Sequence, residues 1–349
     1  MIIFIRHINE QSFEHYHMKK YLFFLLLFIC FCSTIYCQII TGTVLEKNTN
    51  SPIQHALVYF NGTSAGTYTD QKGFFELDIS KNSSMPLTIS ALGYYSITLN
   101  DFPTNNPLLV YLPLKVFELN EVNISVKADK NLRKQNLKLF KEIFLGKTDN
   151  ASNCEIINEN DIIIFHENDT LKAYSLKPIL VNNKALGYKI SYYLDKFEFI
   201  EKNQTFSFTG NIIFDEDLPI NNRRKEVIAI RRVNSYLGSR MHFFRALWEN
   251  NLNSTGFSVS TTTNIKLNYN DIVIQKYNPL NMDTIKYLKY AGGFGISYFS
   301  HFPDSFIEFN NDSIYFDRNG YFDGLGITWE GRMGEQRVSD MLPYEFLRF

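Results

Sequence analysis

The chain has 349 residues, enough for two domains of common size, and its charge nearly cancels: 35 Lys and Arg against 36 Asp and Glu leave a net charge of −1. Nucleic-acid-binding proteins need a basic face, so this balance argues against that class and against strong electrostatic steering of a charged partner. The sequence is rich in aromatic residues, with 21 Tyr and 31 Phe. Because aromatic side chains favour strands, we interpret most of them as β-sheet packing.

The N-terminal residues have the pattern of an export signal. The charged triplet Met18-Lys19-Lys20 is followed by an apolar run from Leu22 to Cys32. We therefore expect residues 1–17 to be an extension, residues 18–37 to be a signal peptide, and the mature chain to begin at Gln38. The apolar run is short for a membrane-spanning helix, and a retained anchor is the alternative.

The cysteines fit an exported chain without disulfides. Cys30, Cys32 and Cys37 precede the expected cleavage site, which leaves Cys154 alone in the mature chain. Cys32 follows Phe31, and no small residue precedes Cys37 either, so the lipoprotein pattern is poor. Cys154 has no basic neighbours in sequence that would activate a thiolate, and we interpret it as an idle thiol.

The stretch from Thr41 to Ile79 has the two-residue period of short strands. Three segments show this alternation: Thr41–Glu46, Leu57–Phe60 and Phe74–Ile79. Between them, Thr69–Gly73 is interpreted as a hairpin turn, because Asp70 can bind the backbone ahead of it and glycine tolerates positive φ. Strands about ten residues apart, separated by Gly, Asp and Asn, predict a β-sandwich.

The same residues resemble the carboxypeptidase regulatory-like domain of Bacteroidetes envelope proteins. The shared pattern is Gly-x-Val, Pro-Ile, Ala-x-Val, Gly-Thr-x-x-Gly and Thr-Asp-x-x-Gly-x-Phe, which begin here at Gly42, Pro52, Ala56, Gly62 and Thr69. Later strands at Pro86–Tyr94, Val110–Leu112 and Leu119–Val122 extend the resemblance over residues 38–127. It implies a transthyretin-like sandwich of about seven strands that acts as an accessory module without catalysis. Two positions depart from the pattern: Glu46 replaces the common Asp, and His55 replaces Gly or Asn.

Residues 128–349 predict an α+β domain with an antiparallel sheet and about three helices, so the whole chain is expected to be mainly β with α. A charged linker, Lys127–Lys130, leads into a helix over Asn131–Leu145 that Gly146 ends. A meander of at least four antiparallel strands is then expected at these segments: 161–166, 171–176, 187–201 and 205–214.

Two helices are predicted after this meander. Asn221 or Asn222 can cap the first, whose apolar stripe is Val227, Ile230, Val233 and Leu237. Ser239 can cap the second, which is expected to continue to Leu252 before Gly256 ends it. The remaining strands are expected at 261–267, 272–277, 285–290, 295–299, 305–309 and 313–316, with a hairpin turn at Asp317–Gly320.

The densest polar and aromatic clusters supply the candidate ligand-binding residues: Tyr236, Arg240, His242, Arg245, Trp248, Trp329 and Arg337. The two segments that hold most of them, 236–248 and 331–343, resemble the C-terminal region of uncharacterised proteins that carry the same first module. That likeness implies no activity. The simpler interpretation is that these side chains fix helices to the sheet, with Arg337 pairing with Asp340.

No residue set predicts catalysis or a cofactor. A zinc carboxypeptidase needs a His and a Glu three residues apart and a distant His, and the four histidines after Gln38 lack that spacing. No Gly-x-Ser-x-Gly elbow is present. Gly292-Gly293-Phe294-Gly295 lacks the residues of a phosphate loop and is interpreted as a bend.

We therefore expect a non-enzymatic, exported cell-envelope protein that acts by binding or scaffolding, in the periplasm or associated with the outer membrane. Its partners would be an envelope glycan, a peptide or an outer-membrane protein, and not nucleic acid. Two alternatives remain open: an envelope hydrolase with an unrecognised site after residue 128, and a small outer-membrane β-barrel, since the terminal Phe349 also ends many such barrels.

Overall fold

The computed structural model describes residues 38–82, 84–115, 130–278 and 283–346. The contacts below lie within one compact unit, Ile39–Phe349. The predicted leader with its three cysteines, the strand expected at residues 119–122, most of the linker and Phe349 lie outside the described residues. Among those described, no helix is both long enough and apolar enough to cross a bilayer.

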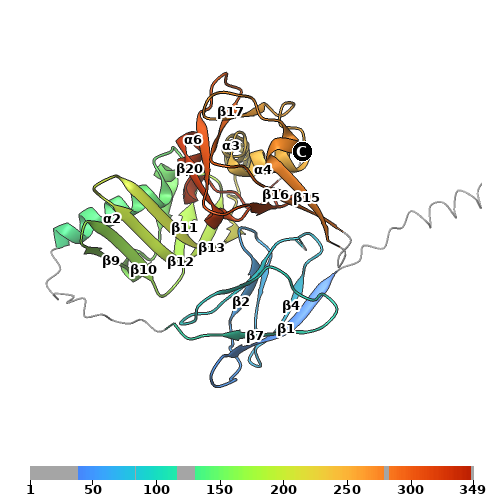
Figure 1. Cartoon of the computed structure of the whole chain (residues 1–349). Coiled ribbons are helices and arrows are strands. Elements are labelled where there is room, and N and C mark those ends of the chain that lie inside the picture. The colour runs from blue at the N-terminus through green and yellow to red at the C-terminus, as the bar shows by residue number, and fades with distance from the viewer. Residues whose placement is uncertain (1–37, 83, 116–129, 279–282, 347–349) are drawn as a thin grey trace, which may run out of the picture. The chain divides into compact units, whose positions relative to one another are not determined.

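The first part of the chain is a sandwich of two sheets, drawn in blue to teal in Figure 1. One sheet has the order β4-β1-β7 and the other β3-β2-β5-β6, which confirms the predicted fold of about seven strands. The strands are β1 Ile39–Glu46, β2 Leu57–Phe60, β3 Gly66–Tyr68, β4 Phe74–Asp78, β5 Leu87–Ser90, β6 Ile97–Leu99 and β7 Leu108–Leu112. Side chains alternate along β1, β4 and β7, and their buried members form the sandwich core with β2 and β5.

The turn at Asp70 forms as predicted, but it does not close a hairpin. Asp70 Oδ1 accepts hydrogen bonds from the N–H groups of Lys72 (2.8 Å) and Phe74 (2.9 Å). Gly73 has φ +72°. However, β3 pairs with β2 and β4 pairs with β1, so the turn carries the chain from one sheet to the other. Turn chemistry is local, whereas the partner of each strand is set by the sheet on which its apolar side chains are buried.

The next part is a six-stranded sheet built around the long strand β12 (Tyr188–Ile200). Its strands β9 (Ile162–Glu167), β10 (Thr170–Ser175), β12 and β13 (Thr205–Glu216) are consecutive antiparallel neighbours, which confirms the predicted meander. Two strands were not predicted: β11 (Ile179–Asn183) pairs with the first half of β12, and β8 (Cys154–Ile156) pairs with β11.

Helix α2 (Lys130–Leu145) covers this sheet, as the green elements of Figure 1 show. The Phe140 ring lies 4.7 Å from the Phe197 ring, and the Phe144 ring lies 4.9 Å from that of Tyr192. Gly146, with φ +97°, follows the last residue of α2, as predicted.

Helices α3 (Asn222–Tyr236) and α4 (Arg240–Trp248) begin at the predicted caps. The Asn221 side chain accepts from the N–H of Arg224, and the Ser239 side chain accepts from that of His242. Of the predicted apolar stripe of α3, Val233 packs against the core of the six-stranded sheet. The stripe is otherwise wrong as a packing face, because Val227, Ile230 and Leu237 are 46%, 62% and 42% exposed. The opposite face of α3 is buried, at Ile228. Helix α4 is nearly all buried and ends before the predicted Leu252.

Two further sheets complete the α+β part: β14-β17-β18-β20 and β15-β16-β19. Their strands are β14 Phe257–Ser260, β15 Val273–Asn278, β16 Asp283–Leu288, β17 Phe294–Tyr298, β18 Ser305–Phe309, β19 Ile314–Phe316 and β20 Ile327–Glu330. Two short helices, α5 (Tyr269–Ile272) and α6 (Gly331–Gly334), join them. The strand expected at 261–267 is wrong: the Thr261 N–H donates to the Ile265 carbonyl, and Asn264 has φ +63°, so this stretch is a turn.

The sandwich and the rest of the unit are joined by backbone hydrogen bonds at the Gly62-Thr63 motif. The N–H of Gly62 donates to the Ile212 carbonyl (2.8 Å), and the N–H of Phe214 donates to the Thr63 carbonyl (2.9 Å). The Tyr344 N–H also donates to the Gly62 carbonyl (2.8 Å). The motif therefore connects β13 with the C-terminal segment 334–346, a role that the sequence did not reveal.

Candidate functional site

Most of the predicted ligand-binding side chains gather near the start of α4. The Tyr236 ring lies 4.7 Å from the His242 ring, and the Arg245 guanidinium lies 5.3 Å from the Tyr236 centroid. The Arg240 guanidinium lies 5.8 Å from the Trp329 ring. The buried Trp329 Nε1 has no hydrogen-bond partner among the described residues, whereas the arginines and His242 are bonded to other parts of the chain.

Arg245 is buried and holds the C-terminal segment. Its Nε donates to the Asn319 carbonyl (2.9 Å), Nη1 to the Phe346 carbonyl (2.9 Å) and Nη2 to the Tyr344 carbonyl (3.0 Å). A guanidinium offers five N–H donors in a rigid fork, so one side chain can satisfy several backbone carbonyls at once. Arg245 therefore fastens two segments of chain far from α4 in sequence.

Arg240 and Arg337 have similar roles. Arg240 Nη2 donates to the Gln336 carbonyl (2.7 Å), and its backbone N–H donates to Gln336 Oε1 (3.0 Å). Burial, with the nearby Arg337 cation adding to it, lowers the pKa of Arg240 to about 10. Arg337 donates to the carbonyls of Gly334 and Gln336 and stacks 4.2 Å over the Phe206 ring. Its expected partner Asp340 instead accepts from Thr148 and Asn150.

His242 is a buried, neutral ring at neutral pH. Its Nδ1 accepts a hydrogen bond from the Gly238 N–H (3.1 Å), and its ring lies 4.9 Å from that of Phe257. Burial lowers the pKa of His242 to about 4, and the neighbouring Arg245 cation adds to this shift. With Nδ1 occupied and the ring packed among aromatics, His242 supports the junction between α3 and α4.

Trp248 lies at the other end of α4. The Lys286 ammonium is 4.7 Å from its ring centroid and donates to its backbone carbonyl (2.6 Å). The predicted residues thus lie in packed contacts along α4 and the segment 329–346, and ligand binding by them stays a prediction.

The thiol of Cys154 is half-buried, and burial raises its pKa to about 12, which keeps it protonated at neutral pH.

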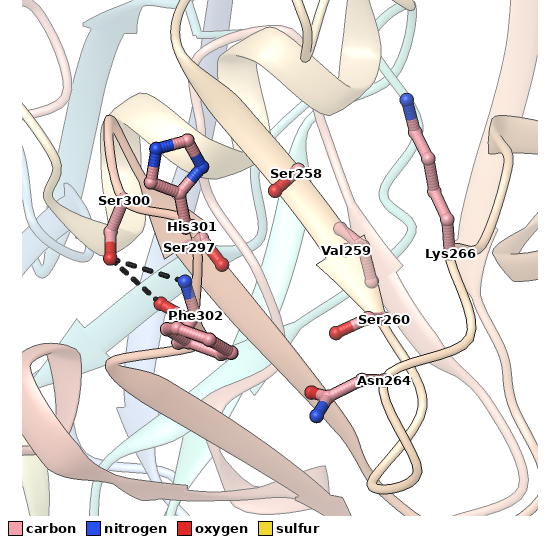
Figure 2. A pocket seen from close by; sticks show the side chains of 9 residues that line it. All are labelled: Ser258, Val259, Ser260, Asn264, Lys266, Ser297, Ser300, His301 and Phe302. Atoms are coloured by element: carbon pink, nitrogen blue, oxygen red, sulfur yellow. Dashed lines mark hydrogen bonds between the residues drawn. The ribbon is translucent and has the colours of Figure 1, made fainter.

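A hollow of about 310 Å³ lies elsewhere, over strand β14. Figure 2 shows its lining, with the Phe302 ring on one side and Ser260 and Asn264 on another. Four of the nine lining residues are serines. The full lining is Ser258, Val259, Ser260, Asn264, Lys266, Ser297, Ser300, His301 and Phe302. The sequence analysis did not identify this site.

Local geometry explains why a hollow forms there. Ser258 and Ser260 alternate with Val259, so both project from the same face of β14, and their partners on β17 are Ser297 and Gly295. A side chain at Gly295 would lie 2.6 Å from Pro303, so its absence lets the loop after β17 fold over the strands. The signal in the sequence was the pair of alternating serines, Ser258 and Ser260.

The loop after β17 presents aromatic side chains to solvent. Phe299 has φ +48°, an uncommon conformation for a bulky residue, and is 79% exposed. Phe302 is 71% exposed at the rim of the hollow. The Ser300 hydroxyl donates to the Phe302 carbonyl and accepts from the Phe302 N–H, as the dashed lines in Figure 2 show. The loop therefore holds an exposed aromatic ring beside hydroxyl groups.

The lining of this hollow is mostly polar. Its lining has four serine hydroxyls, one amide, one ammonium and one imidazole, but no carboxylate. Glycoside hydrolysis commonly needs a pair of carboxylates, which this lining does not supply. Within the described residues, no group of three or more His, Cys, Asp or Glu side chains is placed to hold a metal ion.

These features define a class of protein: a small β-sandwich joined to a larger α+β part that has a polar hollow. A family model described as a CarboxypepD_reg-like domain matches residues 40–124. This segment is therefore a CarboxypepD_reg-like domain, as the resemblance implied, and the match assigns no family to the rest of the chain.

Two further comparisons add little to this assignment. No curated protein matches the chain. Among solved structures, the chain is similar to a 9R-lipoxygenase from Cyanothece PCC8801, with 12% sequence identity and a TM-score of 0.18. The similarity covers 64% of this chain and 53% of the lipoxygenase chain, so it spans about half of that protein. A TM-score this low carries no argument about fold or function.

Proposed function

We propose that this chain is an exported cell-envelope protein that binds its partner without catalysis, and that the hollow over β14 receives a segment of an envelope glycan. The observation that carries the proposal is the combination of serine hydroxyls and the Asn264 amide with an exposed Phe302 ring. Sugars present hydroxyl groups that pair with such donors and acceptors, and an apolar face that packs on an aromatic ring.

Two observations favour binding over hydrolysis at this site. The lining has no carboxylate that could act as a general acid. In the described part of the chain, His301 makes no hydrogen bond to any of the four serines of the hollow, so no nucleophile and base are paired there.

Binding can be measured by calorimetry and by thermal shift with soluble fragments of envelope polysaccharide. Phe302→Ala is expected to weaken binding roughly 5- to 10-fold, because it removes one aromatic packing surface. Asn264→Gly removes the amide while preserving a residue that tolerates positive φ. Leu325→Ala is the matched control, because Leu325 is 70% exposed and lies outside the hollow.

Two results would contradict the proposal. One is a saturable response that Phe302→Ala and Asn264→Gly leave unchanged, or no response to any fragment. The other is release of new reducing ends from the fragments during incubation, which would indicate hydrolysis. Cell fractionation and N-terminal sequencing of the purified protein test the expected export separately from ligand binding.

A further inference from the structure

Helix α3 presents apolar side chains to solvent along one face. Val227 and Ile230 lie at helical spacing and are 46% and 62% exposed, and Leu237, the C-cap residue, is 42% exposed, whereas Val233 between them packs against the core. Ile220, just before the cap of the helix, is 97% exposed. Several exposed aliphatic side chains grouped on and beside a surface helix are a feature of interaction surfaces.

Basic side chains accompany this apolar face. Arg223, Arg224 and Lys225 are exposed in the first turns of α3, and Arg231 is half-exposed further along. Within the described residues, none of these four basic side chains forms an ion pair. Glu226, which follows Lys225, is the acidic residue in this part of the helix. The outer surface of the helix is therefore apolar and carries more basic than acidic side chains.

The opposite face of α3 holds the helix firmly. Ile228 is buried, and Arg232 donates from Nε to the Leu186 carbonyl (2.7 Å) and from Nη1 to Glu216 (2.7 Å). The Arg232 guanidinium also lies 4.0 Å from the centroid of the Tyr188 ring. These contacts fix which side of the helix faces outward.

We propose that the outer face of α3, defined by Ile220, Arg223, Arg224, Val227, Ile230 and Leu237, docks on an anionic membrane surface. A helix with basic and apolar residues on its outer side lies in the plane of a lipid interface, where aliphatic groups enter the headgroup boundary and cations attract anionic lipids. Charge decides among the occupants: a second copy would bring the same positive helix and repel it, whereas an anionic lipid surface complements both components.

The test is co-sedimentation of the full chain with vesicles of phosphatidylethanolamine and phosphatidylglycerol, compared with vesicles of phosphatidylcholine alone. The anionic vesicles are expected to bind the protein more tightly. Arg223→Gln with Arg224→Gln is expected to weaken this binding about 10-fold or more, because each basic residue near an anionic surface contributes separately. Val227→Ser with Ile230→Ser is expected to weaken it by a similar factor. Every variant contains the same residues 1–37, so any vesicle binding by those residues is equal in the wild type and the variants.

Matched controls come from exposed residues elsewhere. Lys134→Gln with Lys138→Gln removes two cations from the exposed side of α2, and Ile157→Ser changes an aliphatic side chain that is 58% exposed. Both controls are expected to bind as the wild type does. Thermal unfolding of each variant checks that it is folded. We expect every variant to fold, because the substituted residues are exposed.

A second measurement reports insertion at the helix itself. Ile230→Trp is expected to shift its added tryptophan emission to shorter wavelength on anionic vesicles, whereas Ile157→Trp shows no shift. Equal binding to both kinds of vesicle, unchanged binding by the α3 variants, or an unshifted Ile230→Trp spectrum would overturn the proposal. So would a wild-type dimer that Val227→Ser with Ile230→Ser converts to a monomer, because a second copy would then cover this face.

Discussion

Within the described part of the sandwich, hydrogen bonds between polar side chains and backbone atoms span at most 16 residues, whereas residues 130–346 combine such local bonds with several that span 74 to 156 residues. Asp70 accepts from residues two and four positions ahead of it. Arg245 donates to carbonyls 74, 99 and 101 residues away, and Asn183 donates to the Ser339 carbonyl 156 residues away. The sandwich closes its turns locally, but the second part depends on a few long-range polar contacts.

This difference shows where each part is vulnerable. A hydrogen bond within a turn affects only the ends of the strands beside it, so its loss leaves the rest of the sheet in place. A buried guanidinium that joins several segments serves all of them, and its loss leaves several carbonyls without donors. The segment 334–346 is held at Gln336, Ser339, Tyr344 and Phe346 by such contacts. We therefore expect stability in the second part to depend on single side chains.

The largest effect is expected for Arg245→Met, which keeps an aliphatic stem but removes every donor. Three carbonyls lose their bonds, and at roughly 1–3 kcal/mol for each unsatisfied buried group the free energy of unfolding should fall by about 4 kcal/mol. Urea unfolding measures the change, and Arg231→Met, on the outer side of α3, is the control. A loss below about 1 kcal/mol for Arg245→Met would contradict the comparison.

Next in size is a pair of isoleucines two positions apart on α3. Ile228 is buried and Ile230 is 62% exposed. Ile228→Ala should therefore cost about 3 kcal/mol through lost burial and the cavity left behind, whereas Ile230→Ala should cost under about 0.5 kcal/mol. Equal costs in chemical denaturation would show that the helix packs by its predicted stripe after all.

A smaller effect is expected where the two regions meet. Gly62 has φ +79°, and a Cβ at this position would lie 2.5 Å from the Tyr344 ring. Gly93 has a similar φ of +84° with nothing within 4 Å of that point. The difference between Gly62→Val and Gly93→Val thus isolates the collision, and overpacking should make the first about 2 kcal/mol costlier. If the two variants unfold at the same urea concentration, Tyr344 moves aside freely.

The smallest effect, counted per pH unit, is a change in the free energy of unfolding that comes from His242. Its pKa is about 4 in the folded chain and 6.5 as the ordinary value. The unfolded chain therefore binds a proton first, so the stability from this residue is complete above about pH 6.5 and falls by about 1.4 kcal/mol per pH unit toward pH 4. His242→Asn places an acceptor near the position of Nδ1 but does not titrate. Its unfolding free energy should depend less on pH between 6.5 and 4, and an identical slope in both proteins would exclude this role.

Much of the fold could be predicted because its signals are local. The caps at Asn221 and Ser239 and the stop at Gly146 use backbone groups within four residues, and all three were correct. The structure shows why the family pattern usually has Gly or Asn at the position of His55. This residue has φ +58°, a conformation that Gly and Asn adopt more readily than most residues.

The errors arose where a local pattern has two outcomes. The turn at Asp70 joins two sheets because turn residues do not select strand partners. The α3 stripe has helical spacing, but spacing alone does not say whether the core or another surface meets it. Three threonines at 261–263 favour a strand, yet Asn264 in a left-handed conformation makes a turn there. The hollow over β14 depends on pairing between β14 and β17, which the sequence does not show.

The segment 334–346 has a consequence for the order in which the chain can fold. Val338, Leu342 and Phe346 complete the hydrophobic layer under the six-stranded sheet, while Tyr344 packs against the sandwich core. The ribosome makes all of the sheets before this segment, so both layers stay open to water until the segment itself has been made. Such late closure exposes apolar surface on the nascent chain, which is where chaperones act.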